Sequence, residues 1–223
     1  MFQDRTDGGQ QLARELLRYQ KLHPLVVALP RGGVPVGYEV ARALDADLDV
    51  IVVRKLGAPG NPEFAIGAVA PDVIEVNRFV VETYGIPDRY VEEVIGRERA
   101  EMERRERLYR RGRDPSNAAG RTVLLIDDGL ATGATASAAV ASIRTQRPER
   151  IVFGAPACAC ESAENLAHNA DEVVCVLRPR DFGAVSLWYR DFVPTTDQEV
   201  TECLDRAARA RAPVGSNPGG GKP

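Results

Sequence analysis

The sequence predicts an α/β fold, a Rossmann-like parallel sheet flanked by helices, and two observations support this prediction. Five short runs rich in Val, Ile and Leu recur along the chain, at residues 24–29, 49–53, 123–126, 150–155 and 172–177. Helical patterns separate several of these runs. Strands that are apolar on both faces are typical of a parallel sheet covered by helices on both sides. The carboxyl ends of such strands form the edge of the sheet where ligands bind.

The elements of the first third follow in a regular order. Apolar positions at helical spacing predict a helix over residues 10–22, after a break at Gly8 and Gly9. The strand at 24–29 leads through a glycine-rich turn into a helix from about 36 to 44. The next strand ends in Arg54 and Lys55, and the prolines and glycines that follow, up to residue 63, predict a mobile loop without regular structure.

An insertion is predicted between this loop and the third strand. Alternating residues at 65–76 indicate a pair of strands, and residues 87–113 indicate a long helix rich in arginine. Glutamates and arginines stand four residues apart on this helix, which indicates a self-neutralised, solvated surface and not a nucleic-acid interface. The pairs are Glu101/Arg105, Glu103/Arg107 and Glu106/Arg110. Residues 110–113 remain candidates to face an anion or a second subunit.

The composition is that of an ordinary globular protein. The chain has 223 residues, a net charge of -3, 44% hydrophobic and 27% charged residues, which suit one domain with no general attraction to nucleic acid or anionic membranes. No apolar stretch reaches membrane-spanning length, and the N-terminus is too polar for a secretory signal, so a cytoplasmic protein is expected. We expect residues 1–210 to form the domain, with a final helix from residue 198, and residues 211–223, rich in Gly and Pro, to form a disordered tail.

The cysteines and histidines give no catalytic signal. The four cysteines are Cys158, Cys160, Cys175 and Cys203. No second Cys or His pair at ligand spacing accompanies the first two, so buried reduced thiols are the favoured interpretation. The histidines, His23 and His168, lie in no recognisable hydrolase setting, which disfavours a catalytic triad.

The segment VLLIDDGLATGAT at residues 123–135 is the most informative part of the chain. A buried strand runs into Asp127 and Asp128, and the loop that follows leads into a helix of small residues. Such a loop presents unpaired backbone N–H groups and the positive end of the helix dipole, to which Thr132 and Thr135 add hydroxyl donors; this arrangement suits a phosphate. The two carboxylates suit sugar hydroxyls or a neighbouring Mg²⁺. The alternative is a plain turn that caps the helix.

These thirteen residues resemble the phosphoribosyl pyrophosphate (PRPP) motif of type I phosphoribosyltransferases. The resemblance implies the type I fold, with a small hood from the N-terminal and C-terminal segments. It assigns Asp127 and Asp128 to the ribose hydroxyls, and it implies a Mg²⁺ cofactor held mainly by the ligand, with the same two carboxylates as candidate metal ligands. The loop that would wrap the 5′-phosphate contains Gly129, Ala131, Thr132, Gly133, Ala134 and Thr135.

Other segments fit the same family in combination. The turn Pro30-Arg31-Gly32-Gly33 matches its pyrophosphate loop, and the predicted mobile loop matches its lid, with Lys55 as a basic contact and Glu63 as a candidate acid or base. Trp188 belongs to a C-terminal aromatic cluster that would either stack on an acceptor ring or join that segment to the core; the second role is favoured.

The resemblance implies transfer of ribose 5-phosphate from Mg-PRPP to a nitrogen acceptor, a nucleobase or related heterocycle, with release of pyrophosphate. Over residues 20–205 the chain is most similar to a bacterial group with no assigned acceptor, and a homodimer is considered. Ala131 stands where the hypoxanthine and guanine enzymes carry an aspartate, which disfavours those bases. The alternatives are a PRPP-binding regulatory protein and a phosphoribosyl hydrolase. Neither nucleic acid nor a membrane is an expected partner.

Overall fold

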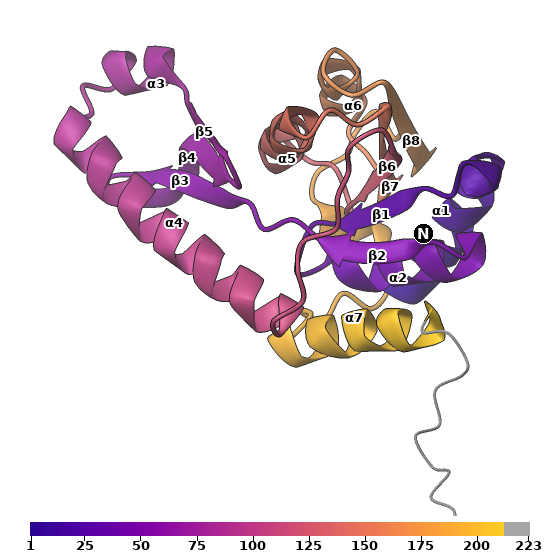
Figure 1. Ribbon diagram of the computed structural model, residues 1–223. Helices are drawn as coiled ribbons and strands as arrows, with labels where there is room; N and C mark the ends of the chain where they lie inside the picture. Colours follow the sequence, from indigo (N-terminus) through magenta and orange to yellow (C-terminus); the bar gives the residue numbers. More distant parts are fainter. Residues whose placement is uncertain (212–223) are drawn as a thin grey trace, which may run out of the picture.

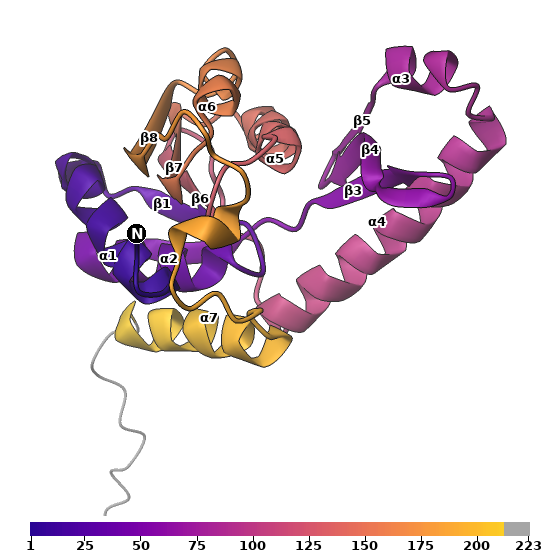
Figure 2. The same cartoon turned by 180° about the vertical axis from the view of Figure 1, so that it is seen from behind.

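A computed structural model describes residues 1–211, and its centre is a five-stranded parallel sheet (Figures 1 and 2). The strand order is β2-β1-β6-β7-β8, and every neighbouring pair is parallel. The strands are β1 (Leu25–Ala28), β2 (Asp47–Val50), β6 (Thr122–Ile126), β7 (Arg150–Ala157) and β8 (Glu172–Leu177). The predicted α/β class and all five strands are confirmed, although β2 ends three residues earlier than predicted.

Helices cover both faces of this sheet. The first face packs against α1 (Arg5–Leu16) and α2 (Gly33–Leu44), and the second against α5 (Ala134–Thr145) and α6 (Cys160–Leu166). The alternation along each strand divides the core: Val26 and Leu124 join the first layer, whereas the next residues, Val27 and Leu125, join the second. The apolar runs predicted the strands correctly because both faces of each strand are buried. Two short 3₁₀ helices, η1 (Leu17–Leu22) and η2 (Val185–Trp188), complete the order of elements with α7 (Asp197–Arg211).

Residues 54–110 form an arm that projects from the central domain (Figure 1). It consists of β3 (Arg54–Ala58), β4 (Asn61–Ala70) and β5 (Val73–Val76) in an antiparallel sheet, followed by α3 (Arg78–Thr83) and α4 (Asp88–Arg110). One face of this sheet packs on α4 through Leu56, Val69 and Met102, while Ala68 and Ala70 pack on Ala138 of α5. The arm is therefore joined to the central domain beside the helix that follows the Asp127-Asp128 segment.

The prediction of an irregular mobile loop over residues 54–63 was wrong. Its residues form β3, a turn and the start of β4. The glycines that suggested disorder have local roles: Gly60 takes the positive φ of the turn, and Gly57 lies at a β-bulge where a Cβ would come within 2.7 Å of Pro62. Pairing with the long strand β4 and packing against α4 stabilise a segment whose composition alone favours a loop.

The long helix of the arm is self-neutralised as predicted. All three predicted Glu/Arg pairs form ion pairs, and the Arg104 and Arg105 guanidinium groups lower the pKa of Glu101 to about 2 by hydrogen bonding. The arginines after residue 109 also pair within the chain, and their role toward an anion or a second subunit stays a prediction. Arg110 bonds Asp49 and the Val50 carbonyl, while Arg111 and Arg113 both pair with Asp205 of α7.

Gly8 and Gly9 do not break the N-terminal helix. Helix α1 begins at Arg5, where the Asp4 side chain accepts the Asp7 N–H as an N-cap. The two glycines lie inside the helix and allow close packing: a Cβ on Gly8 would lie 3.0 Å from Pro156, and one on Gly9 would lie 3.0 Å from the Val36 carbonyl oxygen. The predicted helix therefore starts five residues earlier than the sequence pattern suggested.

Two of the four cysteines form a disulfide, so the interpretation of all four as reduced thiols was wrong. Cys158, directly after β7, is bonded to Cys175 in β8, with their Cα atoms 6.0 Å apart. That separation is within the range that a disulfide requires. Cys160 and Cys203 are free. In the register of β7 and β8, Cys175 stands opposite Ala155, so the bond depends on the path of the chain after β7, which the spacing of the cysteines does not reveal.

Reduction of this disulfide should lower the free energy of unfolding by about 3 kcal/mol, the loop-closure value for a loop of this size. Chemical denaturation with and without dithiothreitol measures the difference. The Cys158→Ala/Cys175→Ala variant should not respond to the reductant, and Cys203→Ala should respond as the wild type does. Thiol titration of the unreduced, unfolded protein should find two free thiols; four would contradict the bond.

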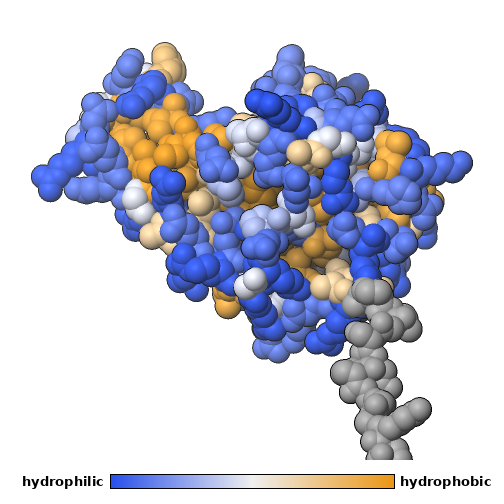
Figure 3. Space-filling model, in the orientation of Figure 1, coloured by the Kyte–Doolittle hydropathy of each residue, from blue (hydrophilic) through white to orange (hydrophobic). Residues whose placement is uncertain are grey.

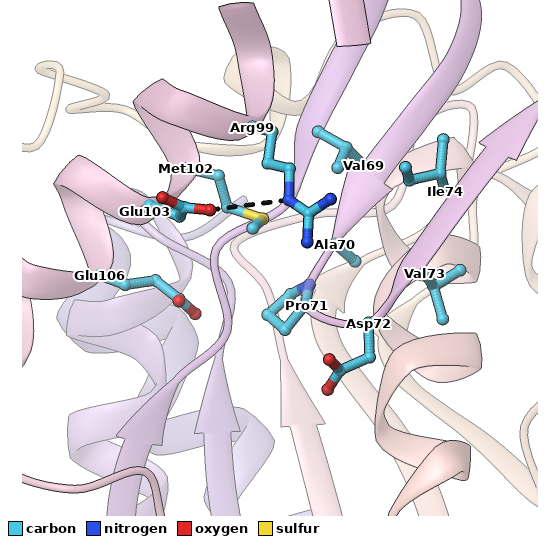
Figure 4. Close-up of a pocket in the computed structure, with 10 residues that line it drawn as sticks. All are labelled: Val69, Ala70, Pro71, Asp72, Val73, Ile74, Arg99, Met102, Glu103 and Glu106. Atoms are coloured by element: carbon cyan, nitrogen blue, oxygen red, sulfur yellow. Dashed lines mark ion pairs between the residues drawn. The ribbon is translucent and has the colours of Figure 1, made fainter. Parts of the chain in front are cut away.

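The surface of the arm is partly apolar, as the orange area over it in Figure 3 shows. Its exposed large apolar residues are Phe64, Ile74, Phe79, Tyr84 and Leu108. A cavity of about 400 Å³ lies between the β4–β5 turn and α4, lined by Asp72, Arg99 and Glu106 among others (Figure 4).

None of the helices within residues 1–211 is long and apolar enough to span a membrane. Arg211, predicted in the tail, ends α7; residues 212–223 of that tail lie outside the described residues.

Candidate active site

The candidate site lies where the strand order reverses. In the sheet, β1 lies between β2 and β6. The carboxyl ends of β1 and β6 are therefore the switch point at which open α/β sheets form a ligand-binding crevice. The Leu29 N–H donates to the Ile126 carbonyl (2.8 Å) and the Gly33 N–H to the Leu29 carbonyl (3.0 Å), which fixes the two following loops beside each other. The structure thus brings the Arg31-Gly32-Gly33 turn and the Asp127-Asp128 pair together, as predicted.

The two glycines of the first turn allow this close approach. A Cβ on Gly32 would lie 1.9 Å from Asp128 Oδ2, and one on Gly33 would lie 2.7 Å from the Ile126 carbonyl oxygen and 2.9 Å from Asp127 Cα. No other residue type fits at either position without movement of the acidic segment. The peptide bond between Pro30 and Arg31 is cis. The backbone of the first loop therefore forms one wall of the site and the two aspartates form the other.

The surroundings of Asp127 and Asp128 shift the pKa values of both carboxyl groups. Asp127 Oδ1 accepts the backbone N–H of Asp128 (2.8 Å), and Asp128 Oδ2 accepts the Nε–H of Arg5 (2.8 Å). Burial, followed by the neighbouring Asp128 charge, raises the pKa of Asp127 well above its ordinary value. Burial also raises the pKa of Asp128, although the Arg5 guanidinium opposes that shift. The two carboxyl groups are therefore partly buried beside each other, with a cation on the Asp128 side, which favours ligands that supply hydroxyl donors or a second cation.

Two further residues support the pair, and the sequence analysis identified neither. Arg5 is the first residue of α1, and its side chain is only 12% exposed. The Tyr189 hydroxyl donates to the Asp128 carbonyl at 2.6 Å. Burial and the Asp128 charge raise the pKa of Tyr189, so this hydroxyl remains a donor at neutral pH. Both residues lie more than 60 positions from Asp128 in the chain, and only the start of an N-capped helix at Asp4 could have drawn attention to Arg5.

The second loop runs from Gly129 to Gly133 and opens α5. Leu130 anchors it, because its N–H donates to the Ala157 carbonyl and its carbonyl accepts the Ala159 N–H. Ser162 Oγ also donates to the Ala131 carbonyl. Gly133 takes a left-handed conformation with φ +79° as the N-cap of the helix. The residues that remain exposed are Ala131, Thr132, Ala134 and Thr135, so a fixed loop presents its hydroxyl groups and the helix N-terminus outward.

Arg31 connects the first loop to the arm and to α7. Its Nη1 lies 3.8 Å from Asp197 Oδ1, and the buried Tyr109 hydroxyl donates to the same carboxylate oxygen at 2.6 Å. Burial and Asp197 raise the pKa of Tyr109. Because the Arg31 side chain is 42% exposed, it can leave this long contact for an anion without losing a buried partner.

The remaining predicted site residues belong to β3, β4 and η2. Lys55 stands opposite Ala68 in the register of β3 and β4, so it shares the sheet face that packs toward α5. A cavity of about 620 Å³ lies between this sheet and the start of α5, with Ala134 and Ser137 in its lining. Glu63 belongs to β4. Trp188 stacks on Phe182 and donates to its carbonyl, within a cluster that includes Phe2 and Tyr189.

A divalent cation fits the donor set only if a ligand completes its coordination. Among residues 1–211, no group of three or more His, Cys, Asp or Glu side chains comes together as a metal site. Asp127 and Asp128 supply two hard carboxylates at the crevice, and Mg²⁺ commonly binds through one or two carboxylates together with substrate phosphates. The residues present therefore suit Mg²⁺ that arrives with a phosphorylated ligand.

Comparison with known proteins agrees with this geometry. A sequence model described as "Phosphoribosyl transferase domain" matches residues 3–186. The chain is 43% identical over 217 residues to two Mycobacterium tuberculosis proteins, named "Putative phosphoribosyl transferase MT0597" (strain CDC 1551) and "Putative phosphoribosyl transferase Rv0571c" (strain H37Rv). The match covers 97% of this chain but 49% of each relative, so the chain spans about half the length of these proteins.

One solved structure shares the fold over most of the chain. TT1426 from Thermus thermophilus superposes with a TM-score of 0.78 at 41% identity, and the match covers 92% of this chain and 97% of that one. The match to the domain model includes both loops of the crevice and the Asp127-Asp128 pair. The chain therefore belongs to the phosphoribosyltransferase family.

Proposed function

We propose that this protein transfers ribose 5-phosphate from Mg-PRPP to a nitrogen acceptor, a nucleobase or related heterocycle, and releases pyrophosphate. The observation that supports this most strongly is the meeting of three anion- and hydroxyl-binding features at one crevice. They are the Arg31-Gly32-Gly33 turn, the Asp127-Asp128 pair, and the exposed loop before α5. PRPP carries a diphosphate, a ribose diol and a 5′-phosphate, one group for each feature.

Each feature has a chemical role in this proposal. The Asp127 and Asp128 carboxylates accept hydrogen bonds from the ribose hydroxyls, while the N–H groups of the α5 N-terminus and the Thr132 and Thr135 hydroxyls bind the 5′-phosphate. Arg31 binds the diphosphate, and its positive charge stabilises the pyrophosphate as it departs. Lys55, on the sheet face toward α5, is a further proposed anion contact. Catalysis then rests on positioning and electrostatic stabilisation.

Mg²⁺ would be held by the phosphate oxygens of PRPP, with Asp127 and Asp128 beside it, and would supply positive charge to the diphosphate.

The N-terminal and C-terminal segments form the proposed hood over the site. The Phe2 N–H donates to the Trp188 carbonyl (2.8 Å) and the Arg190 N–H to the Phe2 carbonyl (2.9 Å), which joins the N-terminal and C-terminal segments near Asp128. We propose that these segments contact the acceptor.

A pyrophosphate-release assay with Mg-PRPP and a panel of bases tests this function. We expect release that depends on an acceptor, at about 1 s⁻¹ or faster with the correct base. Hypoxanthine and guanine should be poor acceptors, because Ala131 cannot exchange a proton with the base. Asp127→Asn keeps the side-chain shape and is the matched control, in which release at limiting Mg-PRPP should be slower.

The alternatives give different results in the same assay. Release without any acceptor would indicate a hydrolase, and binding of PRPP without release would indicate a regulatory protein on the same fold. Rapid turnover of hypoxanthine or guanine would contradict the expectation from Ala131. No binding of Mg-PRPP at all would overturn the proposed function.

A further inference from the structure

Arg5 is held in one position by three contacts with two separated parts of the chain. Its Nε donates to Asp128 Oδ2 at 2.8 Å, and its Nη1 donates to the Val193 carbonyl at 2.7 Å. Its guanidinium carbon lies 3.9 Å from the centre of the Phe192 ring. Because a planar guanidinium can stack and donate at the same time, these contacts fix both its place and its plane.

The position of Arg5 matters because the adjacent carboxylate has few other restraints. The Asp128 side chain is 15% exposed and lies beside a second carboxylate, Asp127. Two neighbouring carboxylates repel each other, and an uncompensated charge out of water is unfavourable. Arg5 is the cation that contacts this pair within residues 1–211.

Arg5 contacts the Asp128 carboxylate without occupying all of its acceptor positions. Arg5 contacts Oδ2 of Asp128 through a single N–H, whereas an ionised carboxylate has two oxygens and about four lone-pair directions. Within the described residues, Oδ1 of Asp128 and both oxygens of Asp127 accept no hydrogen bond from Arg5. A residue that had to leave for the ligand would have to break the Phe192 and Val193 contacts as well. Those contacts favour an Arg5 that stays beside Asp128 when the ligand binds over an Arg5 that must move away first.

We propose that Arg5 is a positioning residue of the PRPP site, which orients the Asp128 carboxylate toward the ribose hydroxyls without itself binding the diphosphate. This inference rests on the proposed function, because it assigns Asp128 to the ribose. It also gives the C-terminal segment a role, since Phe192 and Val193 hold Arg5 and Tyr189 holds the Asp128 backbone. The N-terminal helix and the C-terminal segment thus act on the ligand through one carboxylate.

Calorimetric titration of the full chain with three probes tests the proposal: Mg-PRPP, ribose 5-phosphate and pyrophosphate with Mg²⁺. For Arg5→Gln we expect at least a tenfold loss of affinity for the two ribose-containing probes and less than a twofold change for pyrophosphate. Arg5→Lys keeps the charge but not the planar fork, so it should recover part of the lost affinity. Arg14→Gln, an exposed arginine on the same helix, is the matched control and should leave all three affinities unchanged.

Each other outcome overturns the inference. Tighter binding of PRPP to Arg5→Gln would show that Arg5 must move away before the ligand binds, and an equal loss for all three probes would show a general structural role. Unchanged affinities would show that Asp128 needs no support. If Arg5→Gln does not fold, as judged by thermal denaturation, the same comparison of probes is made with Arg5→Lys. Failure of the wild type to bind any ribose probe would instead refute the proposed function, so the two failures are distinguishable.

Discussion

Asp127→Asn should weaken Mg-PRPP binding by roughly 10- to 100-fold while raising the stability of the ligand-free protein. The loss corresponds to one hydrogen bond to a charged group, about 1.5–3 kcal/mol. The gain in stability is expected because burial and the Asp128 charge disfavour an ionised Asp127, and so raise its pKa, in the folded state. Asparagine keeps the oxygen that accepts the Asp128 N–H and removes the unfavourable charge.

The stabilisation by Asp127→Asn should depend on pH. The folded state holds the Asp127 proton to higher pH than the unfolded state, so wild-type stability falls as pH rises from about 4 through the raised pKa. The stabilising effect of Asp127→Asn should therefore be small at pH 4 and larger at pH 8, measured by chemical denaturation. Asp114→Asn, at an exposed position, is the control and should change neither stability nor affinity. Unchanged PRPP affinity, or a destabilised Asp127→Asn protein, would contradict the account.

Gly32→Ala should reduce PRPP affinity at least tenfold, although it adds a single methyl group. That methyl would lie 1.9 Å from Asp128 Oδ2 and 3.2 Å from Arg5 Nε, so either the first loop or the Asp128 carboxylate must move. Small displacements of positioning groups have large effects on binding and rate. Overpacking should also lower the free energy of unfolding by about 1–3 kcal/mol.

The matched control for Gly32→Ala is Gly96→Ala in helix α4. No atom lies within 4 Å of a Cβ at Gly96, so the substitution should stabilise the helix by up to about 1 kcal/mol and leave PRPP binding unchanged. Calorimetry and chemical denaturation on both variants make the comparison. Wild-type affinity in Gly32→Ala would show that the close approach of the two loops is not required.

The sequence predicted the central sheet well because burial on both faces leaves a simple apolar signal, as in residues 123–126. The candidate loops followed from local chemistry: two acids after a strand, or two glycines after another. The arm was harder to predict, since Gly57 and Gly60 serve a bulge and a turn in regular structure, and only pairing with β4 distinguishes that from a loop. Arg5 and the Cys158–Cys175 bond depend on contacts between distant segments, which the sequence pattern does not encode locally.

A crystal structure of the full chain grown with Mg²⁺ and PRPP shows directly where PRPP binds. We expect the 5′-phosphate at the loop from Gly129 to Thr135, the ribose hydroxyls on Asp127 and Asp128, and the diphosphate at Arg31 and the backbone of Gly32 and Gly33. Arg5 should keep its contact with Asp128 in that complex. PRPP bound elsewhere on the molecule, or bound in the crevice with the ribose hydroxyls away from both aspartates, would contradict this expectation.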